Sequence, residues 1–131
     1  MFEARTIGMM INKKSSDVYG FVREPMNLAA WANSFCVSVA QKKKDWYVES
    51  GDGTARVQFE TENSYGVLDF TLRLVNGEEL YYPMRVVPHK DRCEVMLTIF
   101  RLPEVSEENF LLDGAMAAND LRQLKETLES I

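Results

Sequence analysis

The sequence contains little cysteine and almost no histidine. Its 131 residues include two cysteines, Cys36 and Cys93, and a single histidine, His89. The cysteines are far apart and lack the C-x-x-C spacing or the neighbouring His and Cys residues of a metal site. We therefore expect both to be small buried residues in strands, and we expect no metal ion and no cofactor. His89 falls in a Pro-His-Lys-Asp turn pattern without an identifiable Ser or Asp partner, which argues against a catalytic triad.

Two further features are absent, an excess of positive charge and a long hydrophobic run. The formal net charge is −5, with 15 Lys and Arg against 20 Asp and Glu, which argues against nucleic-acid binding. The basic run at residues 42–44 is short and lies between two strand patterns, where an exposed hairpin turn is the simplest interpretation. No apolar run reaches the roughly 18 to 20 residues of a membrane span, and the first residues lack a secretory signal pattern. We therefore expect a cytoplasmic protein.

Most of the chain alternates apolar and polar residues with the period of two that is typical of β-strands. These strand patterns cover residues 3–11, 35–40, 46–48, 55–61, 67–74, 82–86 and 93–102. Short turns separate most of them, and Asn76-Gly77 is the strongest hairpin signal. The pattern predicts an antiparallel meander.

Three helices interrupt or close this strand pattern. A short helix is expected over residues 15–22, capped by Ser15 or Ser16, and a second one begins near Pro25 and continues to about residue 33. The last stretch, residues 106–131, is one long amphipathic helix that begins at Ser106 as N-cap. Its inward face steps by four and three residues along Phe110, Gly114, Ala117, Leu121, Leu124, Leu128 and Ile131.

This helix face is small at one end and bulky at the other. Gly114 and Ala117 in its first half leave room for a cavity between the helix and the sheet, whereas the leucines of its second half can seal a core. The face is expected to be entirely apolar, so that any reaction chemistry would come from the sheet. A cavity near Gly114 and Ala117 is therefore predicted.

Several short motifs and the order of elements resemble a known superfamily. The matching residues are Val18-Tyr19-x-Phe21-Val22, Pro25-x-Asn27, Trp31-Ala32, Trp46, Gly66-Val67-Leu68-Asp69-Phe70, Pro83-Met84-Arg85-Val86-Val87-Pro88, Glu94-Val95-x-x-Thr98 and Asp120-Leu121-x-x-Leu124-Lys125. With these residues the chain resembles the START-like (SRPBCC) superfamily, in particular the polyketide cyclase/dehydratase-like group of small bacterial proteins. The resemblance covers nearly the whole chain.

The resemblance implies one α+β domain over residues 1–131 with the helix-grip fold. About seven antiparallel strands would curve around the long C-terminal helix, with two short helices after the first strand. Members of the superfamily bind or transform lipids, sterols, polyketides and other apolar molecules, but the fold does not imply one activity. This chain carries Phe70 where the resemblance leads us to expect a histidine, so any proton chemistry at that position is absent here.

Large or adaptable side chains and the small residues of the last helix are the candidates for a ligand site. The predicted ligand-binding residues are Trp31, Trp46, Phe59, Phe70, Tyr82, Met84, Met96, Thr98, Gly114 and Ala117. Ordinary core packing is the alternative interpretation for the large apolar residues of this set. Thr98 and Glu94 share one face of the last strand and would orient a ligand only if that face points inward.

Three charged residues are the candidates for catalysis. Asp69 interrupts an apolar strand, where a carboxylate could act as a general base. Strand alternation instead places it on the face away from Leu68 and Phe70, and Arg85 on the neighbouring strand could pair with it. A structural Asp69–Arg85 pair is the favoured interpretation, and Glu94 is a third weak candidate.

Three functions remain open from the sequence. The first is a non-catalytic module that binds a small hydrophobic molecule, and a second copy of the chain in a homodimer is a further partner to consider. The second is a cyclase- or dehydratase-type enzyme that uses Asp69, Arg85 or Glu94 to polarise a carbonyl. The third is an interaction module resembling the chaperone-ATPase activators of the same superfamily. The direction of Asp69 and Arg85 distinguishes the first two, and the volume of the cavity tests the first.

Overall fold

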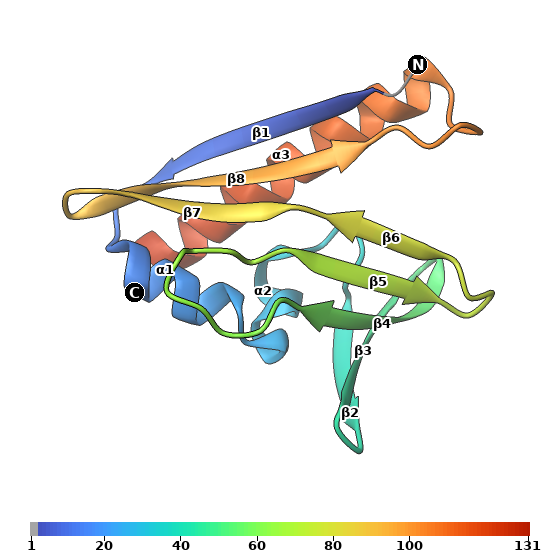
Figure 1. Ribbon diagram of the computed structural model, residues 1–131, viewed down its shortest axis with the longest axis horizontal. Helices are drawn as coiled ribbons and strands as arrows, with labels where there is room; N and C mark the ends of the chain where they lie inside the picture. Colours follow the sequence, from blue (N-terminus) through green and yellow to red (C-terminus); the bar gives the residue numbers. More distant parts are fainter. Residues whose placement is uncertain (1–2) are drawn as a thin grey trace.

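A computed structural model describes residues 3–131 (Figure 1). Its elements, in chain order, are β1 (Ala4–Ile11), α1 (Ser15–Val22), the 3-10 helix η1 (Pro25–Asn27), α2 (Leu28–Trp31), β2 (Ser38–Lys42), β3 (Asp45–Ser50), β4 (Gly53–Phe59), β5 (Phe70–Leu74), β6 (Glu79–Tyr82), β7 (Met84–His89), β8 (Arg92–Phe100) and α3 (Glu107–Glu129). All strand pairs are antiparallel, and α3 packs against β1, β8 and α2. The predicted α+β helix-grip fold is confirmed.

The strands form two hydrogen-bonded sheets that meet along one seam. One sheet has the order β1-β8-β7 and the other the order β2-β3-β4-β5-β6. The seam lies where the segment before β5 contacts β7, through a bridge between Val67 and Arg85. There Leu68 N donates to Met84 O at 2.8 Å, and Val86 N donates to Gly66 O at 2.9 Å. The two sheets therefore continue into each other as one curved surface.

Pro83 explains why eight strands are present where about seven were expected. A single strand over residues 82–86 was predicted, but Pro83 separates β6 from β7. Proline has no N–H to contribute to a ladder, although its carbonyl still accepts from Thr98 N at 2.9 Å. The chain bends at this residue and passes from one sheet to the other.

The predicted inward face of the long helix α3 packs against the sheet. Six of the seven residues predicted for this inward face are buried: Phe110, Gly114, Ala117, Leu121, Leu124 and Leu128. The seventh prediction is wrong, because α3 ends at Glu129 and Ile131 lies beyond it with 79% of its surface exposed. The predicted N-cap is confirmed, since Ser106 Oγ accepts from Asn109 N at 3.1 Å.

Two boundaries differ from the sequence prediction for identifiable reasons. The first helix is not capped by a serine, because its N-cap is Lys14 and no side chain caps it. Strand β4 ends at Phe59 and β5 begins only at Phe70, since the intervening chain is held by the Asn63 side chain. That amide accepts from Tyr65 N and Val67 N and donates to Val67 O, which replaces ladder pairing by local hydrogen bonds.

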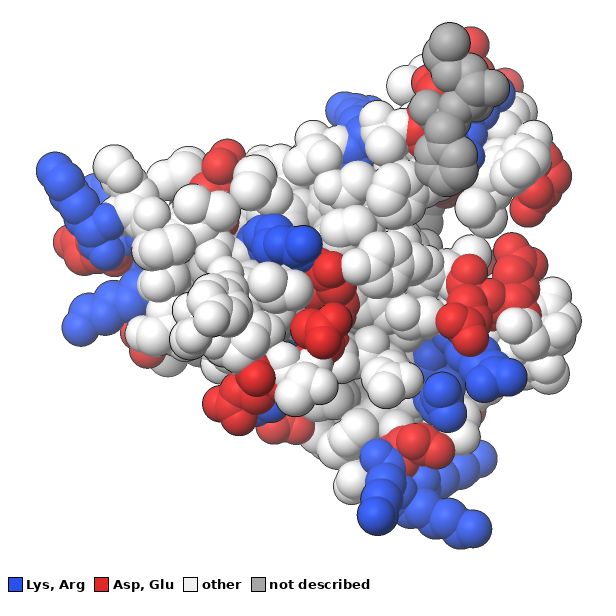
Figure 2. Space-filling model, viewed as in Figure 1, with Lys and Arg blue, Asp and Glu red and all other residues white. Residues whose placement is uncertain are grey.

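One group of basic side chains lies at the tip of a hairpin. Figure 2 shows basic side chains gathered at the tip of the β2–β3 hairpin, where residues 42–44 are exposed as expected. Lys43 adopts a positive φ of 59° in this turn, a conformation typical of tight hairpins. Within residues 3–131, no helix is both long and apolar enough to cross a membrane.

Candidate functional site: a cavity between the sheet and the C-terminal helix

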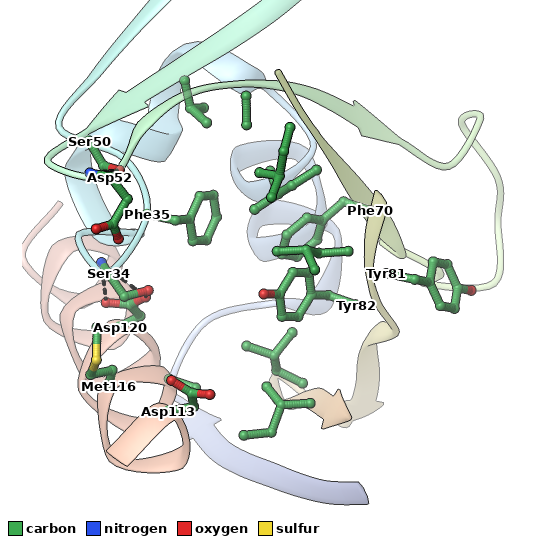
Figure 3. A pocket seen from close by; sticks show the side chains of 18 of the residues that line it. Ser34, Phe35, Ser50, Asp52, Phe70, Tyr81, Tyr82, Asp113, Met116 and Asp120 are labelled. Carbon is green, nitrogen blue, oxygen red and sulfur yellow. Dashed lines mark hydrogen bonds between the residues drawn. The ribbon is translucent and has the colours of Figure 1, made fainter. Parts of the chain in front are cut away.

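A cavity of about 690 Å³ lies between the concave side of the sheet and α3 (Figure 3). Its rim is formed by the β3–β4 and β5–β6 hairpins, the chain after β8 and the first half of α3. Its apolar wall consists of Trp31, Phe35, Val48, Ala55, Phe70, Leu72, Leu74, Leu80, Tyr82, Leu97, Ile99, Phe100, Leu102, Val105, Met116 and Ala117. This volume falls within the range of small-molecule sites, roughly 300 to 1,000 Å³.

Aromatic rings centred on Phe70 form one side of the cavity. The Phe70 ring stacks on Phe35 with centroids 5.7 Å apart and on Tyr82 with centroids 5.0 Å apart. Phe59 contacts the same ring from behind at 5.5 Å, but it does not line the cavity. Phe70 begins β5 and Tyr82 ends β6, so their pairing across these two strands fixes both rings. The stack is a rigid apolar platform for a ligand.

The opposite side of the cavity is polar and comes largely from α3. Asp113 and Asp120 are seven residues apart and therefore share one helix face. Asp120 is only 3% exposed. Its carboxylate accepts from Ser34 N at 3.2 Å and from the Ser34 hydroxyl. Burial raises the pKa of Asp120, and the two hydrogen bonds from Ser34 oppose that rise.

Tyr82 and Asp113 line the cavity, and within residues 3–131 their polar groups have no hydrogen-bond partner. In Figure 3 the Tyr82 hydroxyl points into the cavity toward the α3 side. Burial raises its pKa, and the negative charge of Asp113 raises it further. Burial also raises the pKa of the Asp113 carboxyl. The cavity therefore offers an uncommitted hydroxyl and an uncommitted carboxylate to a ligand.

Four of the ten predicted ligand-binding residues line this cavity. They are Trp31, Phe70, Tyr82 and Ala117. The other six, Trp46, Phe59, Met84, Met96, Thr98 and Gly114, lie elsewhere. Met84 is fully buried in the core. The Arg5 guanidinium covers Gly114, since a Cβ built there would lie 2.6 Å from Arg5 Nη1.

The inward face of β8 is the apolar one. Val95, Leu97 and Ile99 are buried, and the alternate residues Glu94, Met96 and Thr98 face outward. The Thr98 hydroxyl pairs with that of Thr6 on β1 at 2.7 Å. The Glu94 side chain lies over Gly8. The condition under which Glu94 and Thr98 would orient a ligand in the cavity is therefore not met.

The candidate catalytic pair lies on the outer side of the sheet. Asp69 is 7% exposed and forms an ion pair with Arg85, and it also accepts from Met84 N at 2.9 Å and Tyr81 Oη at 2.5 Å. Figure 3 shows the Tyr81 ring pointing away from the cavity. Asp69, Arg85 and Glu94 are all absent from the lining. The pair lies beside Pro83, where the chain passes from β6 to β7.

The sequence interpretation missed the acidic residues of α3. The inward face of this helix was expected to be entirely apolar, and that expectation is wrong because Asp113 and Asp120 line the cavity beside Ala117. Their spacing of seven residues, with Ala117 midway, was the available signal. Ser34 and Phe35 were also missed, since they precede β2 in an irregular segment.

Neither cysteine is positioned for nucleophilic chemistry. Both side chains are fully buried, and burial raises the pKa of Cys36 to about 11 and also raises that of Cys93. A thiol is unreactive while it is protonated and inaccessible. We therefore expect no reaction of either thiol with a disulfide reagent in the native protein at pH 8, and two thiols per chain after denaturation. Rapid labelling of a native thiol would contradict the packing of Cys36 and Cys93.

The curved antiparallel sheet, the two short helices and the gripped C-terminal helix define the START-like, or SRPBCC, fold. No protein-family profile matches the sequence, and no curated protein sequence does. Solved structures do match. The protein XoxI from Bacillus cereus has a TM-score of 0.72 at 18% identity, with 95% of this chain and 94% of that chain covered.

Two further structures extend the comparison. A START superfamily protein from Mycobacterium smegmatis has a TM-score of 0.71 at 12% identity and 97% coverage of both chains. The di-domain ARO/CYC protein BexL of the BE-7585A biosynthetic pathway has a TM-score of 0.71 at 16% identity. It matches 97% of this chain but only 46% of its own length, so this chain corresponds to about one of its domains. At these identities the similarity shows the fold alone.

Proposed function

We propose that this chain binds a small hydrophobic molecule in the cavity between its sheet and α3, without catalysing a reaction. The observation that carries the proposal is the cavity of about 690 Å³ with its mainly apolar lining. A site of this size buries most of a drug-sized ligand, and burial of apolar surface contributes roughly 25 cal/mol per Å². The ARO/CYC and START proteins have the same fold, which supports the ligand-binding part of this proposal.

The three predicted catalytic residues, Asp69, Arg85 and Glu94, do not line the cavity, which favours binding over catalysis. Asp69 and Arg85 point away from the cavity and are occupied with each other. Neither thiol is accessible, and His89 is exposed at the end of β7, outside the lining. The cyclase-type alternative thereby loses the acid–base candidates on which it rested. A cytoplasmic location and a homodimer stay predictions.

A neutral fluorescent dye tests the cavity as a binding site. We expect N-phenyl-1-naphthylamine to bind with one-to-one stoichiometry and to gain fluorescence in the apolar wall. Ala117→Phe places a ring in the cavity from α3, and Leu97→Phe does so from β8. Each is expected to weaken dye binding at least about tenfold, because the added ring takes ligand volume. Fluorescence titration with matched thermal melts measures both effects.

The control for this experiment is Ala30→Phe. Ala30 is exposed on α2 and does not line the cavity, so the same change in size should leave the dye affinity within about twofold. If all three variants weaken dye binding equally, the dye does not bind in the cavity. The same conclusion follows if the dye binds saturably and both cavity variants leave its affinity unchanged. Native mass spectrometry of protein purified from its own host would then identify a retained ligand directly.

A further inference from the structure

Every charged side chain that lines the cavity is acidic. Asp52, Glu79, Asp113 and Asp120 all contribute to the lining, and within residues 3–131 no Lys, Arg or His does. None of these four carboxylates forms an ion pair with a Lys, Arg or His side chain within residues 3–131. Asp120 is buried, where a lower local dielectric strengthens the field of its charge, whereas Asp52, Glu79 and Asp113 are exposed at the rim. The cavity is therefore electrostatically suited to a cation and unsuited to an anion.

The geometry of α3 concentrates two of these charges in one line. Asp113, Ala117 and Asp120 are at positions i, i+4 and i+7 of the helix, so they lie above one another on the face that borders the cavity. Figure 3 shows both carboxylates across the cavity from Phe70 and Tyr82. A ligand between the two walls would contact carboxylates on one side and aromatic rings on the other. Both surfaces attract a positively charged nitrogen, the rings through their negative faces.

The same wall also contains a buried polar atom. Trp31 is fully buried and lines the cavity. Its indole N–H is a buried donor without a hydrogen-bond partner among the described residues. Such donors are rare because each costs free energy when left unpaired. An indole N–H is only a donor and cannot pair with an ammonium group, so the charge preference of the cavity rests on the carboxylates and the aromatic rings.

The carboxylates are arranged for an organic cation rather than a metal ion. Within the described part of the chain, no three His, Cys, Asp or Glu side chains come close enough together to hold a metal. Metal ions need several ligands at about 2 to 2.6 Å, whereas an ammonium group needs only one or two charged or polar acceptors. Asp113 and the Tyr82 hydroxyl are such acceptors on the two sides of the cavity, and neither forms a hydrogen bond or ion pair within residues 3–131.

We propose that the ligand of this cavity is an amphiphile with a positively charged nitrogen, held between the α3 carboxylates Asp113 and Asp120 and the aromatic wall of Phe70 and Tyr82. The proposal rests on the binding function proposed above and specifies the chemical class of ligand. The apolar body of the ligand occupies the wall formed by Leu72, Leu97 and Ile99. The nitrogen lies toward Asp113, where the cavity opens along the first half of α3.

Three naphthalene probes of nearly equal size test the charge preference. They are 2-naphthylmethylamine, which is a cation at pH 7, the neutral 2-naphthylmethanol and the anion 2-naphthoate. We expect the cation to bind at least about tenfold more tightly than the alcohol, and the anion to bind most weakly. Isothermal titration calorimetry at low ionic strength measures all three affinities on the full chain.

Amide substitutions then assign the effect to individual carboxylates. Asp113→Asn and Asp120→Asn should each reduce cation binding about five- to tenfold and leave the alcohol within twofold. Asp91→Asn is the matched control, because it removes the same charge at an exposed turn far from the lining. Thermal melts verify that each variant is folded. Asp113 is exposed, so its variant keeps the test valid even if Asp120→Asn unfolds.

The outcomes separate this inference from the function on which it rests. If the alcohol binds in the cavity as tightly as the amine, the charge preference is wrong and the binding function stands. If the anion binds more tightly than the amine, the charge preference is likewise wrong and the binding function stands. If none of the three probes binds, and the neutral dye does not bind either, the proposed binding function itself fails. An equal loss of amine affinity in Asp91→Asn would attribute the preference to net charge and also overturn the proposal.

Discussion

Replacing Asp69 by alanine is expected to lower the free energy of unfolding by about 3 kcal/mol. The carboxylate is nearly fully buried and accepts hydrogen bonds from Met84 N, Tyr81 Oη and the Arg85 guanidinium. Alanine removes all three acceptor contacts at once. Met84 N would then be a buried donor without a partner, and Arg85 would lose its counter-charge. Urea denaturation followed by circular dichroism measures the loss.

The position of Asp69 explains why the loss should be large. Asp69 lies directly before β5, at the seam where β5, β6 and β7 meet around Pro83. Since Pro83 has no N–H, the ladder is interrupted there, and the carboxylate of Asp69 takes the N–H of the next residue instead. The side chain therefore completes the hydrogen bonding that the backbone leaves open.

A second aspartate provides the control for this prediction. Asp45 pairs with Arg56 at 4.0 Å, and its side chain is 51% exposed. Exposed pairs of this kind contribute less than about 1 kcal/mol, so Asp45→Ala should have little effect. If Asp69→Ala and Asp45→Ala lower the free energy of unfolding by similar amounts, the Asp69 carboxylate does not stabilise the junction of the sheets. The milder variant Asp69→Asn should still bind the neutral dye. If a folded Asp69→Asn loses dye binding, Asp69 belongs to the ligand site after all.

The order of elements and the core face of α3 could be predicted because they depend on local patterns. The Asn76-Gly77 turn joins β5 to β6 as expected, and Gly77 has a φ of 89°. The inward face of α3 is buried from Phe110 to Leu128, and helical periodicity alone was enough to predict it. Periodicity also placed Asp69 away from Phe70. It could not show that Tyr81 and Arg85 would cover the carboxylate, since that depends on strands that are distant in sequence.

The cavity was predictable in place but not in composition. Ala117 indicated its position correctly, whereas Gly114 did not, because the side chain of Arg5 fills the space above it. Which neighbouring helix residues border the cavity depends on how far the sheet curves away from α3. That curvature depends on how the two sheets join and is not encoded in the helix itself. Asp113 and Asp120 therefore resembled ordinary solvent-facing acids in the sequence.

The other large effect is expected at Gly66, where the segment before β5 contacts β7. Gly66→Ala should lower the free energy of unfolding by about 2 to 4 kcal/mol. Gly66 has a φ of 73°, and a Cβ built there would lie 2.3 Å from the carbonyl oxygen of Val86. This oxygen belongs to the backbone of β7 and cannot rotate away. Moving it would also stretch the 2.9 Å hydrogen bond from Val86 N to Gly66 O.

Gly77→Ala separates the close approach from the backbone conformation. Gly77 also has a positive φ, but a Cβ there would meet no atom within 4 Å. Alanine at Gly77 should therefore cost only the left-handed conformation, about 1 to 2 kcal/mol. The difference between the two variants in urea denaturation isolates the contact between Gly66 and β7. If the two losses are equal, the sheets do not meet as closely as the geometry indicates, and the curvature that opens the cavity must be held by Asp69 and Pro83 alone.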